Sequence, residues 1–441
     1  MSLPVLRVGG RIVGSPLAMA VAAFAYRAAV ALTSSTGPEL LVPSKHIAMG
    51  FEVGNIARAV ASGHGFSSPF GIATGPTAWL PPVYPLLLAG IYKIFGTGTQ
   101  ASDQVALMAN CLFSALVPVF LYAAGKSYFT PRVGILAGWI WVFLPTALRY
   151  STRWVWDTTL SALLMAALFW YTLTLRDAKP RRSLFLGYAA LWTFALLTNA
   201  AFSVLLPVFV LWVVWSLRRR GHDAVRLAGW TVLVVILGVS PWFVRNYIVF
   251  DRFVPFRSNF GLELYLGTNE ETSDPQLWWR HPYENEQERA LYMKLGEPAY
   301  MDLKKEEAFQ FIREHPGAWL GLVRSRFVET WTGGRDPTLD VWPLATRRGR
   351  LRIVFNYTYA LCGLLGVLVV RRSSPELAMP LAAVILLYPV VYYITHTNLR
   401  YRHPLEPVLV LSASVAVCRA AQAVYQRARR LASGGFALHR G

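Results

Sequence analysis

The stretch that decides the fold runs from residue 201 to residue 248. It reads AFSVLLPVFVLWVVWSL (201–217), RRRGHDAVR (218–226) and LAGWTVLVVILGVSPWFVRNYI (227–248). Each apolar run is close to the roughly 20 helical residues that are needed to cross a bilayer core of about 30 Å. Four of the five arginines lie in the segment between the two runs, and the fifth, Arg245, lies near the end of the second run. This pattern predicts two transmembrane helices joined by a basic loop.

Similar apolar runs recur along the whole chain. We expect ten membrane-spanning helices, near residues 16–33, 105–122, 133–148, 157–175, 183–198, 201–217, 227–248, 353–370, 376–394 and 404–420. The first run is followed by a polar stretch rather than by a small-residue cleavage site, so we expect a retained anchor. The predicted fold class is an all-α polytopic membrane protein.

The composition excludes several other classes. Of the 441 residues, 54% are apolar and only 15% are charged, and this content excludes a disordered chain. The formal net charge of +19 is compatible with nucleic-acid binding. The basic residues, however, lie at the ends of apolar runs and form no continuous face. The three cysteines lie in or beside apolar runs, which excludes a disulfide scaffold.

The distribution of Lys and Arg predicts the orientation. With the N-terminus in the cytoplasm, the predicted cytoplasmic segments carry 18 basic residues, whereas the short outer connections 149–156 and 395–403 carry four. This asymmetry places both termini in the cytoplasm. Arg27 lies inside the first predicted span, where we expect its side chain to snorkel towards the interface.

The run PPVYPLLLAGIYKIF (81–95) would reverse the predicted orientation of all later spans if it were itself a transmembrane helix. If it crossed the membrane, the basic loops that follow would lie outside. It is short and begins with clustered prolines, so we expect a helix lying at the outer interface. The predicted parts are a transmembrane module 1–248 containing an outer loop 34–104, a small helical extracytoplasmic unit 249–352, and C-terminal helices with a basic tail, 353–441.

The first outer loop carries several candidate site residues. Glu52 and Asn55 are three residues apart beside the apolar face of a predicted short helix. A glycine-rich loop with His64 follows, and then Trp79 and Tyr84. A carboxylate can take a proton from a hydroxyl, and aromatic rings offer faces to a sugar. The alternative is that Glu52 is a solvated residue on an interfacial helix.

Two further groups of polar residues lie at predicted outer ends of spans. Asp157 begins the fourth span four residues after Arg153, which is compatible either with a helix cap and ion pair or with a role in a site. Arg400, Arg402 and His403 cluster in the last outer connection. Arginines in such a position can hold a phosphate through paired N–H groups, or they can anchor the helices at the interface.

Motifs for other chemistries are missing from the sequence. It contains no GxxxxGK[ST] phosphate loop, no GxSxG elbow and no CxxC pair. The histidines on the predicted outer side do not pair at a zinc-ligand spacing. We therefore predict no metal site and no required cofactor, although a divalent metal is not excluded.

The arrangement resembles the GT-C membrane glycosyltransferases, in particular the family 39 group with the protein O-mannosyltransferases and the lipid A aminoarabinose transferases. The stretches that carry the resemblance are FEVGNIARAVASGHGF, GPTAWLPPVYPLLLAGIYKIFG, the Asp157 helix start, LGEPAYMDLKKEEAFQFIREHPGAW and LRYRHPLEP. The resemblance implies a polyprenyl-phosphate sugar donor and transfer at the outer face. It also implies that Glu52 and Asp157 are the catalytic carboxylates.

The expected reaction is a metal-independent single displacement that inverts the sugar. Glu52 would deprotonate the acceptor hydroxyl, and the loop 63–80 would close over the sugar. The donor phosphate would be held by Arg400 and Arg402, with Arg153 and His403 nearby; Asn55, His64, Trp79 and Tyr84 would bind sugar and acceptor.

A lipid-linked sugar transporter and a non-catalytic envelope-assembly protein are the alternatives. A bacterial plasma membrane is the expected location, and nucleic acid is not an expected partner. The sequence identifies neither the sugar nor the acceptor.

Overall fold

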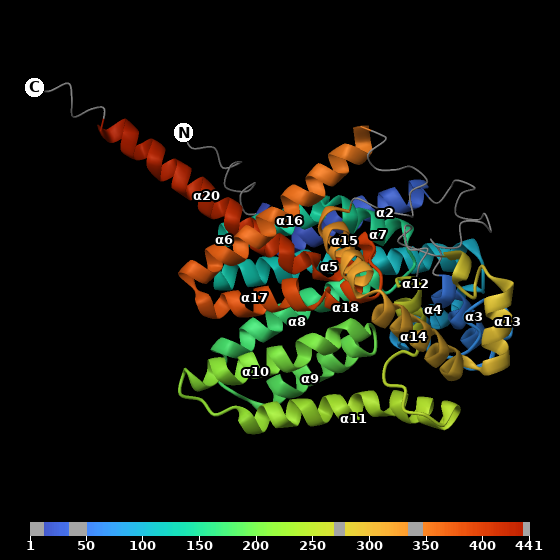
Figure 1. Ribbon diagram of the computed structural model, residues 1–441. Coiled ribbons are helices and arrows are strands. Elements are labelled where there is room, and N and C mark those ends of the chain that lie inside the picture. The colour runs from blue at the N-terminus through green and yellow to red at the C-terminus, as the bar shows by residue number, and fades with distance from the viewer. Residues whose placement is uncertain (1–12, 35–50, 269–277, 334–346, 435–441) are drawn as a thin grey trace, which may run out of the picture.

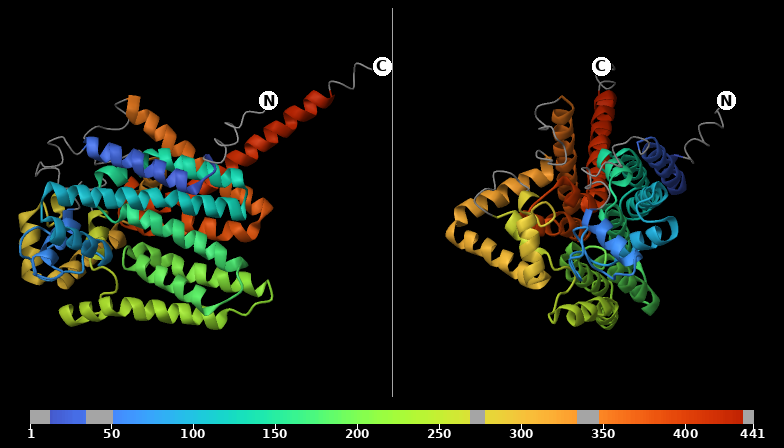
Figure 2. Two further views of the ribbon diagram at one scale, coloured as in Figure 1. Left: turned by 180° about the vertical axis from the view of Figure 1, so that it is seen from behind. Right: turned by 90° about the vertical axis from the view of Figure 1, so that its right-hand side faces the viewer.

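The computed structural model describes residues 13–34, 51–268, 278–333 and 347–434. Within these ranges the chain is helical, and one isolated bridge between Ser67 and Pro76 is the only β-type pairing. Long helices lie roughly alongside one another, and a group of shorter helices gathers at one end of the bundle (Figures 1 and 2). The all-α class predicted from the sequence is therefore confirmed.

Eight helical segments in the described ranges are long and apolar enough to cross a membrane. The helices in them are α2 (Pro16–Ser34), α5 (Gln100–Tyr128), α8 (Thr158–Asp177), α10 (Leu205–Arg218, preceded by the short helix η3, Ala200–Val204), α11 (Val225–Phe250), α16 (Arg347–Ser373), α17 (Pro375–Leu387, continued by α18, Val390–Ile394) and α20 (Glu406–Gly434, preceded by α19, Leu399–Arg402).

The expected number of ten spans is not confirmed. The run near 133–148 is a bent pair, α6 (Pro131–Phe143) and α7 (Pro145–Arg153), whose axes differ by 47°, so the described chain has up to nine spans if the pair counts as one. The run near 183–198 forms α9 (Arg182–Leu196), which has 15 residues and packs beside α8 and α11.

The bend between α6 and α7 explains the buried Arg27. Pro145 has no N–H to donate, so the carbonyl of Trp141 loses the helical partner four residues later. Arg27 donates to the carbonyls of Trp141 (2.8 Å) and Val142 (3.1 Å) and to Ser114 (2.9 Å). Its side chain is fully buried. The expectation that Arg27 snorkels is therefore wrong, because the bundle itself supplies acceptors for the guanidinium.

The basic connections gather at one end of the bundle. Arg176 and Arg220 both donate to the carboxylate of Glu376, at 3.1 and 2.8 Å. These residues lie at the α8–α9, α10–α11 and α16–α17 connections, so three of the predicted cytoplasmic segments meet. The α10–α11 and α16–α17 connections lie opposite the end that carries the short helices (Figure 1). This common end agrees with the topology drawn from the charges.

The other end is built from the two segments predicted to lie outside. The first contributes α3 (Phe51–Ala61) and α4 (Val83–Phe95), and the second contributes α12 (Phe260–Leu266), α13 (Glu286–Leu295), α14 (Glu297–Glu314) and α15 (Pro316–Thr332). With 13 residues, α4 is too short to span, and it packs against α3 and α5.

Glu297 ties the two segments together. Its buried carboxylate accepts hydrogen bonds from the Ala78 N–H (2.6 Å), from Ser258 and Tyr292 (2.7 Å each), and from Thr77. A buried carboxylate with this many donors is fully satisfied. It therefore fixes the position of the residues that precede Trp79.

Candidate active site

A cavity lies where the first outer loop, the second outer segment and the ends of several spans meet. It has about 1030 Å³ of empty space, including a part open to solvent. Its wall contains three carboxylates and two arginines, together with aromatic side chains. The charged, histidine and aromatic residues of the wall are Glu52, Asp157, Glu263, Arg257, Arg400, His281, His396, Trp79, Tyr84, Trp156, Tyr392 and Tyr401.

Glu52 lies in the first turn of α3 and is buried at the cavity wall. Burial in this environment raises the pKa of its carboxyl group to about 7, because the charged form loses hydration. A carboxyl group with a pKa near neutrality can act as a general base at physiological pH. The interpretation of Glu52 as a solvated residue is therefore wrong.

His281 contacts Glu52 from the second outer segment. Its Nδ1 accepts the backbone N–H of Tyr283 (3.1 Å), so the ring proton of the neutral imidazole lies on Nε2. Nε2 is 3.6 Å from Oε1 of Glu52. Burial lowers the pKa of His281 to about 4, which keeps the ring neutral. A neutral N–H donor thus faces the carboxyl group without adding a charge.

Asp157 precedes the first residue of α8 at another part of the wall. Its side chain makes no hydrogen bond that caps the helix; Asn199 (3.1 Å) and Ser161 (3.3 Å) donate to Oδ2 instead. Burial raises the pKa of Asp157. Arg153 is exposed, and within the described ranges it forms no ion pair with Asp157. The structural alternative of a cap with an ion pair is not found.

Arg400 is the cation of the wall that has no carboxylate partner. Its guanidinium lies over the rings of Trp156 and Tyr401, with 4.2 and 4.9 Å to the ring centroids. Its side chain donates one hydrogen bond, from Nη2 to the Tyr401 hydroxyl (3.1 Å). Among the described residues, no carboxylate lies within 4.0 Å of it, although it is only 9% exposed. A buried, unneutralised guanidinium that faces a cavity suits an anionic ligand.

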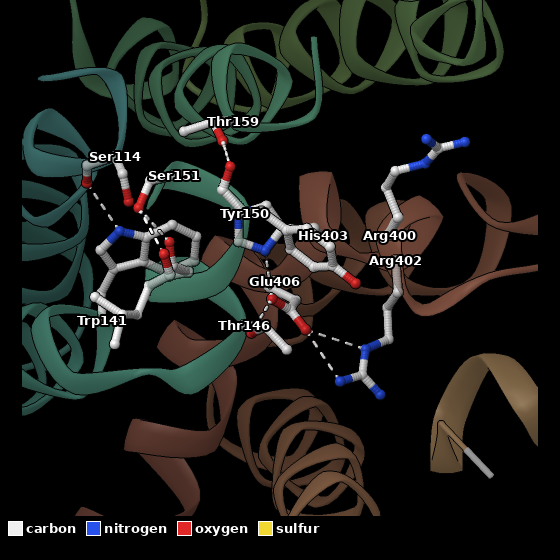
Figure 3. Close-up of polar contacts among 12 residues, drawn as sticks. Ser114, Trp141, Thr146, Tyr150, Ser151, Thr159, Arg400, Arg402, His403 and Glu406 are labelled. Carbon is white, nitrogen blue, oxygen red and sulfur yellow. Dashed lines mark hydrogen bonds and ion pairs between the residues drawn. The ribbon is translucent and has the colours of Figure 1, made fainter. Parts of the chain in front are cut away.

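Arg402 and His403 are not part of the cavity wall. Figure 3 shows the side chains of Arg400 and Arg402 extending in opposite directions, as expected for residues two apart on a helical turn. Arg402 donates to Glu406 (3.0 Å) and to the carbonyls of Thr330 and Trp331. His403 Nδ1 is 2.6 Å from the other oxygen of Glu406. Both side chains are fully buried, so the structure does not place them where a donor phosphate could reach.

Of the other candidate site residues in the first outer loop, two line the cavity and two do not. Trp79 and Tyr84 line the cavity, and the Tyr84 hydroxyl donates to Asn110 on α5 (3.0 Å). Asn55 is buried but donates its amide to the carbonyl of Pro69 (2.8 Å) and does not line the cavity. His64 is exposed and lies outside the wall.

The loop 63–80 is tied down at its base. Arg245 on α11 donates to the carbonyls of Phe66 (2.8 Å) and Thr77 (2.7 Å). Thr77 and Trp79 are buried, and Glu297 holds Thr77 and Ala78. These contacts hold the loop near both of its ends, so they do not favour its closure over a sugar.

Several wall residues were not identified as site residues from the sequence. Glu263 accepts hydrogen bonds from Arg257 (3.0 Å) and Asn259 (2.7 Å), and its Oε2 is 3.2 Å from Nδ1 of His396. Burial alone would raise the pKa of Glu263, but the nearby His396 and Arg257 hold it below its usual value. In the sequence, Arg257 and Glu263 are a basic and an acidic residue six positions apart in a charged segment. Such a spacing is too common to identify a site.

The described residues contain no group of three or more His, Cys, Asp or Glu side chains arranged to hold a metal ion. Five ionisable groups of the wall instead contact one another: Glu52 with His281, and Glu263 with both Arg257 and His396.

Comparisons with known proteins agree with this architecture. Residues 80–244 match the family described as dolichyl-phosphate-mannose-protein mannosyltransferase, and this range includes Tyr84, Asp157 and Asn199 of the wall. No curated protein matches the chain in sequence.

Solved structures resemble the chain in fold. The oligosaccharyltransferase AglB from Archaeoglobus fulgidus, in complex with an inhibitory peptide and a dolichol-phosphate, superimposes with a TM-score of 0.52 at 13% identity. That comparison covers 94% of this chain and 52% of AglB, so the chain spans about half the length of that protein. A second structure of the Archaeoglobus fulgidus oligosaccharyltransferase, with Zn and sulfate, gives 0.51 at 11% identity and covers 95% of this chain and 51% of the other. ArnT from Cupriavidus metallidurans bound to undecaprenyl phosphate gives 0.38 at 16% identity, covering 90% and 77%.

The helices and the cavity at one end of the bundle define an integral multi-pass membrane protein with a polar site where its spans meet short helices. The family match over residues 80–244 and the fold shared with AglB make the chain similar to the GT-C membrane glycosyltransferases.

Proposed function

We propose that the protein transfers a sugar from a polyprenyl-phosphate donor to an acceptor hydroxyl at the extracytoplasmic face of a membrane. The single observation that carries the proposal is Arg400, a buried cation without a carboxylate partner among the described residues, in the same cavity wall as Glu52 and Asp157. An anion-binding group and carboxylates in one cavity are what transfer from a sugar phosphate requires.

In the proposed reaction, Glu52 accepts the proton of the acceptor hydroxyl. The acceptor oxygen then forms a bond to the anomeric carbon, while the bond between that carbon and the phosphate oxygen breaks. The electron pair remains on the lipid phosphate, and Arg400 stabilises the added negative charge. Attack on the face opposite the phosphate inverts the anomeric centre.

The other wall residues would bind and orient the substrates. Asp157, held by Asn199, can accept a hydrogen bond from a hydroxyl of the sugar or the acceptor. Trp79 and Tyr84 offer apolar ring faces to the sugar. Arg402, His403, Arg153, Asn55 and His64 have no role in this proposal, because they lie outside the wall.

The donor class has support from the relatives. The matching family is described by its dolichyl-phosphate-mannose donor, and the AglB structure holds a dolichol-phosphate. The positive-inside distribution of the basic loops supports a membrane orientation with both termini in the cytoplasm and the cavity outside. On composition we propose a bacterial plasma membrane as the location.

The test is incubation of the purified protein with a panel of polyprenyl-phosphate sugars, scored for release of the lipid phosphate. We expect turnover with one donor, and we expect Glu52→Gln to reduce it by about 10³-fold, because a general base contributes roughly 10²–10⁴-fold. Donor binding and folding should be unchanged. Glu286→Gln, at a side chain that is 91% exposed, is the matched control.

Three outcomes would refute the proposal or a part of it. Near-normal turnover by Glu52→Gln would remove Glu52 from the mechanism. Binding of a donor without cleavage under any acceptor would favour a lipid-linked sugar transporter. Absence of both binding and cleavage would favour a non-catalytic assembly protein.

A further inference from the structure

Arg400 is held in place by a chain of side chains that begins at Glu263. Tyr401 Oη is 3.1 Å from Nη2 of Arg400 and 3.0 Å from Nε2 of His396. Nδ1 of His396 is 3.2 Å from Oε2 of Glu263. That contact is close without full hydrogen-bond alignment, and Nδ1 has no other partner among the described residues. Four residues from two distant segments thus form one continuous series of polar contacts.

One assignment of donors and acceptors satisfies every member of this series of contacts. Arg400 can donate but not accept, so the Tyr401 oxygen is the acceptor and its own proton is free for His396. Nε2 of His396 then accepts, which places the proton of a neutral imidazole on Nδ1, facing the carboxylate of Glu263. Each group supplies the partner that the next one needs.

Close backbone packing fixes the first member of the chain. Glu263 lies on α12, whose following residue Gly267 touches the loop before His396: a Cβ on Gly267 would lie 1.8 Å from the carbonyl oxygen of Thr395. Only glycine allows this approach. Arg257 and Asn259 hold the other oxygen of Glu263.

We propose that Tyr401 and His396 are positioning residues that hold Arg400 for the donor phosphate without neutralising it. The inference rests on the proposed function. A carboxylate bound directly to Arg400 would satisfy the guanidinium and compete with the phosphate. The phenol of Tyr401 fixes the Arg400 side chain through one neutral hydrogen bond. The carboxylate of Glu263 does not touch Arg400, because His396 and Tyr401 lie between them. The remaining N–H groups of Arg400 therefore stay available to a ligand.

The experiment measures the affinity of the full-length protein for undecaprenyl phosphate in detergent. We expect Arg400→Met to weaken binding by about 100-fold, since hydrogen bonds to charged groups are the stronger class. Tyr401→Phe should weaken it by about tenfold, and His396→Phe by a smaller factor in the same direction. Tyr393→Phe is the matched control, because the Tyr393 hydroxyl accepts a hydrogen bond from Trp331 (3.0 Å) and Tyr393 does not line the cavity.

A double-mutant cycle separates positioning from a general structural role. If Tyr401 acts through Arg400, Tyr401→Phe should have no further effect on binding in an Arg400→Met background. Independent, additive losses would mean that Tyr401 touches the ligand itself and would overturn the proposal, as would unchanged binding by Tyr401→Phe.

The proposed function fails separately from this inference. Wild-type protein that binds undecaprenyl phosphate but transfers no sugar from any donor would refute the transferase, while the cycle still decides the role of Tyr401. Wild-type protein that does not bind undecaprenyl phosphate would overturn both.

Discussion

Arg400 and Arg402 are the same residue type two positions apart, and the structure puts them in opposite environments. Arg400 faces the cavity, lies over Trp156 and Tyr401, and has no carboxylate within 4.0 Å among the described residues. Arg402 is fully buried on the other side and bonded to Glu406 and two carbonyls. One cation is available to a ligand, and the other already has its partners within the protein.

The difference between them lies in what satisfies the charge. The ion pair of Arg402 joins α19 to α20, and its hydrogen bonds to two carbonyls add α15. Glu406 also accepts from Thr146 of α7 (2.6 Å) and contacts His403. This cluster, defined by Arg402, His403, Glu406 and Thr146, fixes the helices behind the cavity. A charge that is already paired stabilises the fold, whereas a charge that faces a cavity unpaired costs folding energy until a ligand arrives.

The largest expected effect is on stability, from Arg402→Met. Removing one partner leaves the carboxylate of Glu406 buried with fewer donors, and loss of half of a buried ion pair costs about 3–5 kcal/mol. We expect the free energy of unfolding in detergent to fall by about that amount. The same substitution at Arg400 should change it by less than about 1 kcal/mol. Equal losses at the two positions would show that Arg400 is also a structural cation.

The next largest effect is on ligand affinity, and here the substitution of Arg400 should have a larger effect than that of Arg402. Arg400→Met should weaken binding of undecaprenyl phosphate by about 100-fold, whereas Arg402→Met protein that remains folded should bind within about twofold of wild type. Isothermal titration or a fluorescence displacement assay measures both. Loss of affinity at Arg402 with intact folding would place the phosphate on the wrong side of α19.

A third effect is on the pH dependence of transfer. Burial raises the pKa of Glu52 to about 7, and a base must be deprotonated, so turnover should fall about tenfold per pH unit below that value. The positive charge of Arg400 lowers the pKa of Glu52, and Glu263 raises it. Arg400→Met should therefore move the acidic limb of the residual activity to higher pH, and Glu263→Gln should move it to lower pH.

The control for the third effect is Arg402→Met, which should leave the limb in place. A limb that stays fixed in Arg400→Met and Glu263→Gln would mean that Glu52 is not the group that titrates.

The smallest effects are expected at the polar residues that the structure leaves outside the cavity wall. Arg153→Gln and His64→Gln remove exposed side chains that do not line the cavity. Each should change turnover by less than about twofold, because exposed positions away from a site contribute little. A tenfold loss at either position would mean that the substrate extends well beyond the wall.

Local sequence patterns were sufficient for the helices and for part of the site. The apolar runs, the basic connections and the placement of Glu52, Asp157 and Arg400 beside helix ends are all local features. These three residues line one cavity together with Trp79 and Tyr84, and their roles in a reaction stay predictions. Helix formation and membrane insertion depend on consecutive residues, so a single sequence carries this information.

The number of membrane spans could not be predicted correctly from local patterns alone. A run of apolar residues does not reveal whether Pro145 bends its helix by 47° or whether α9 stops after 15 residues. The buried Arg27 shows the same point, because the carbonyls that it satisfies are freed by a bend in another helix.

The sequence by itself determined that the chain is a helical membrane protein, which connections are basic, and which outer segments carry its rare polar residues. Only the tertiary structure decided that Arg400 rather than Arg402 faces the cavity, and that Glu263 and His281 arrive there from the second outer segment. The physical reason is that the direction of a side chain and the partners it meets depend on how distant segments pack. Those contacts join residues more than a hundred positions apart, and no local pattern encodes them.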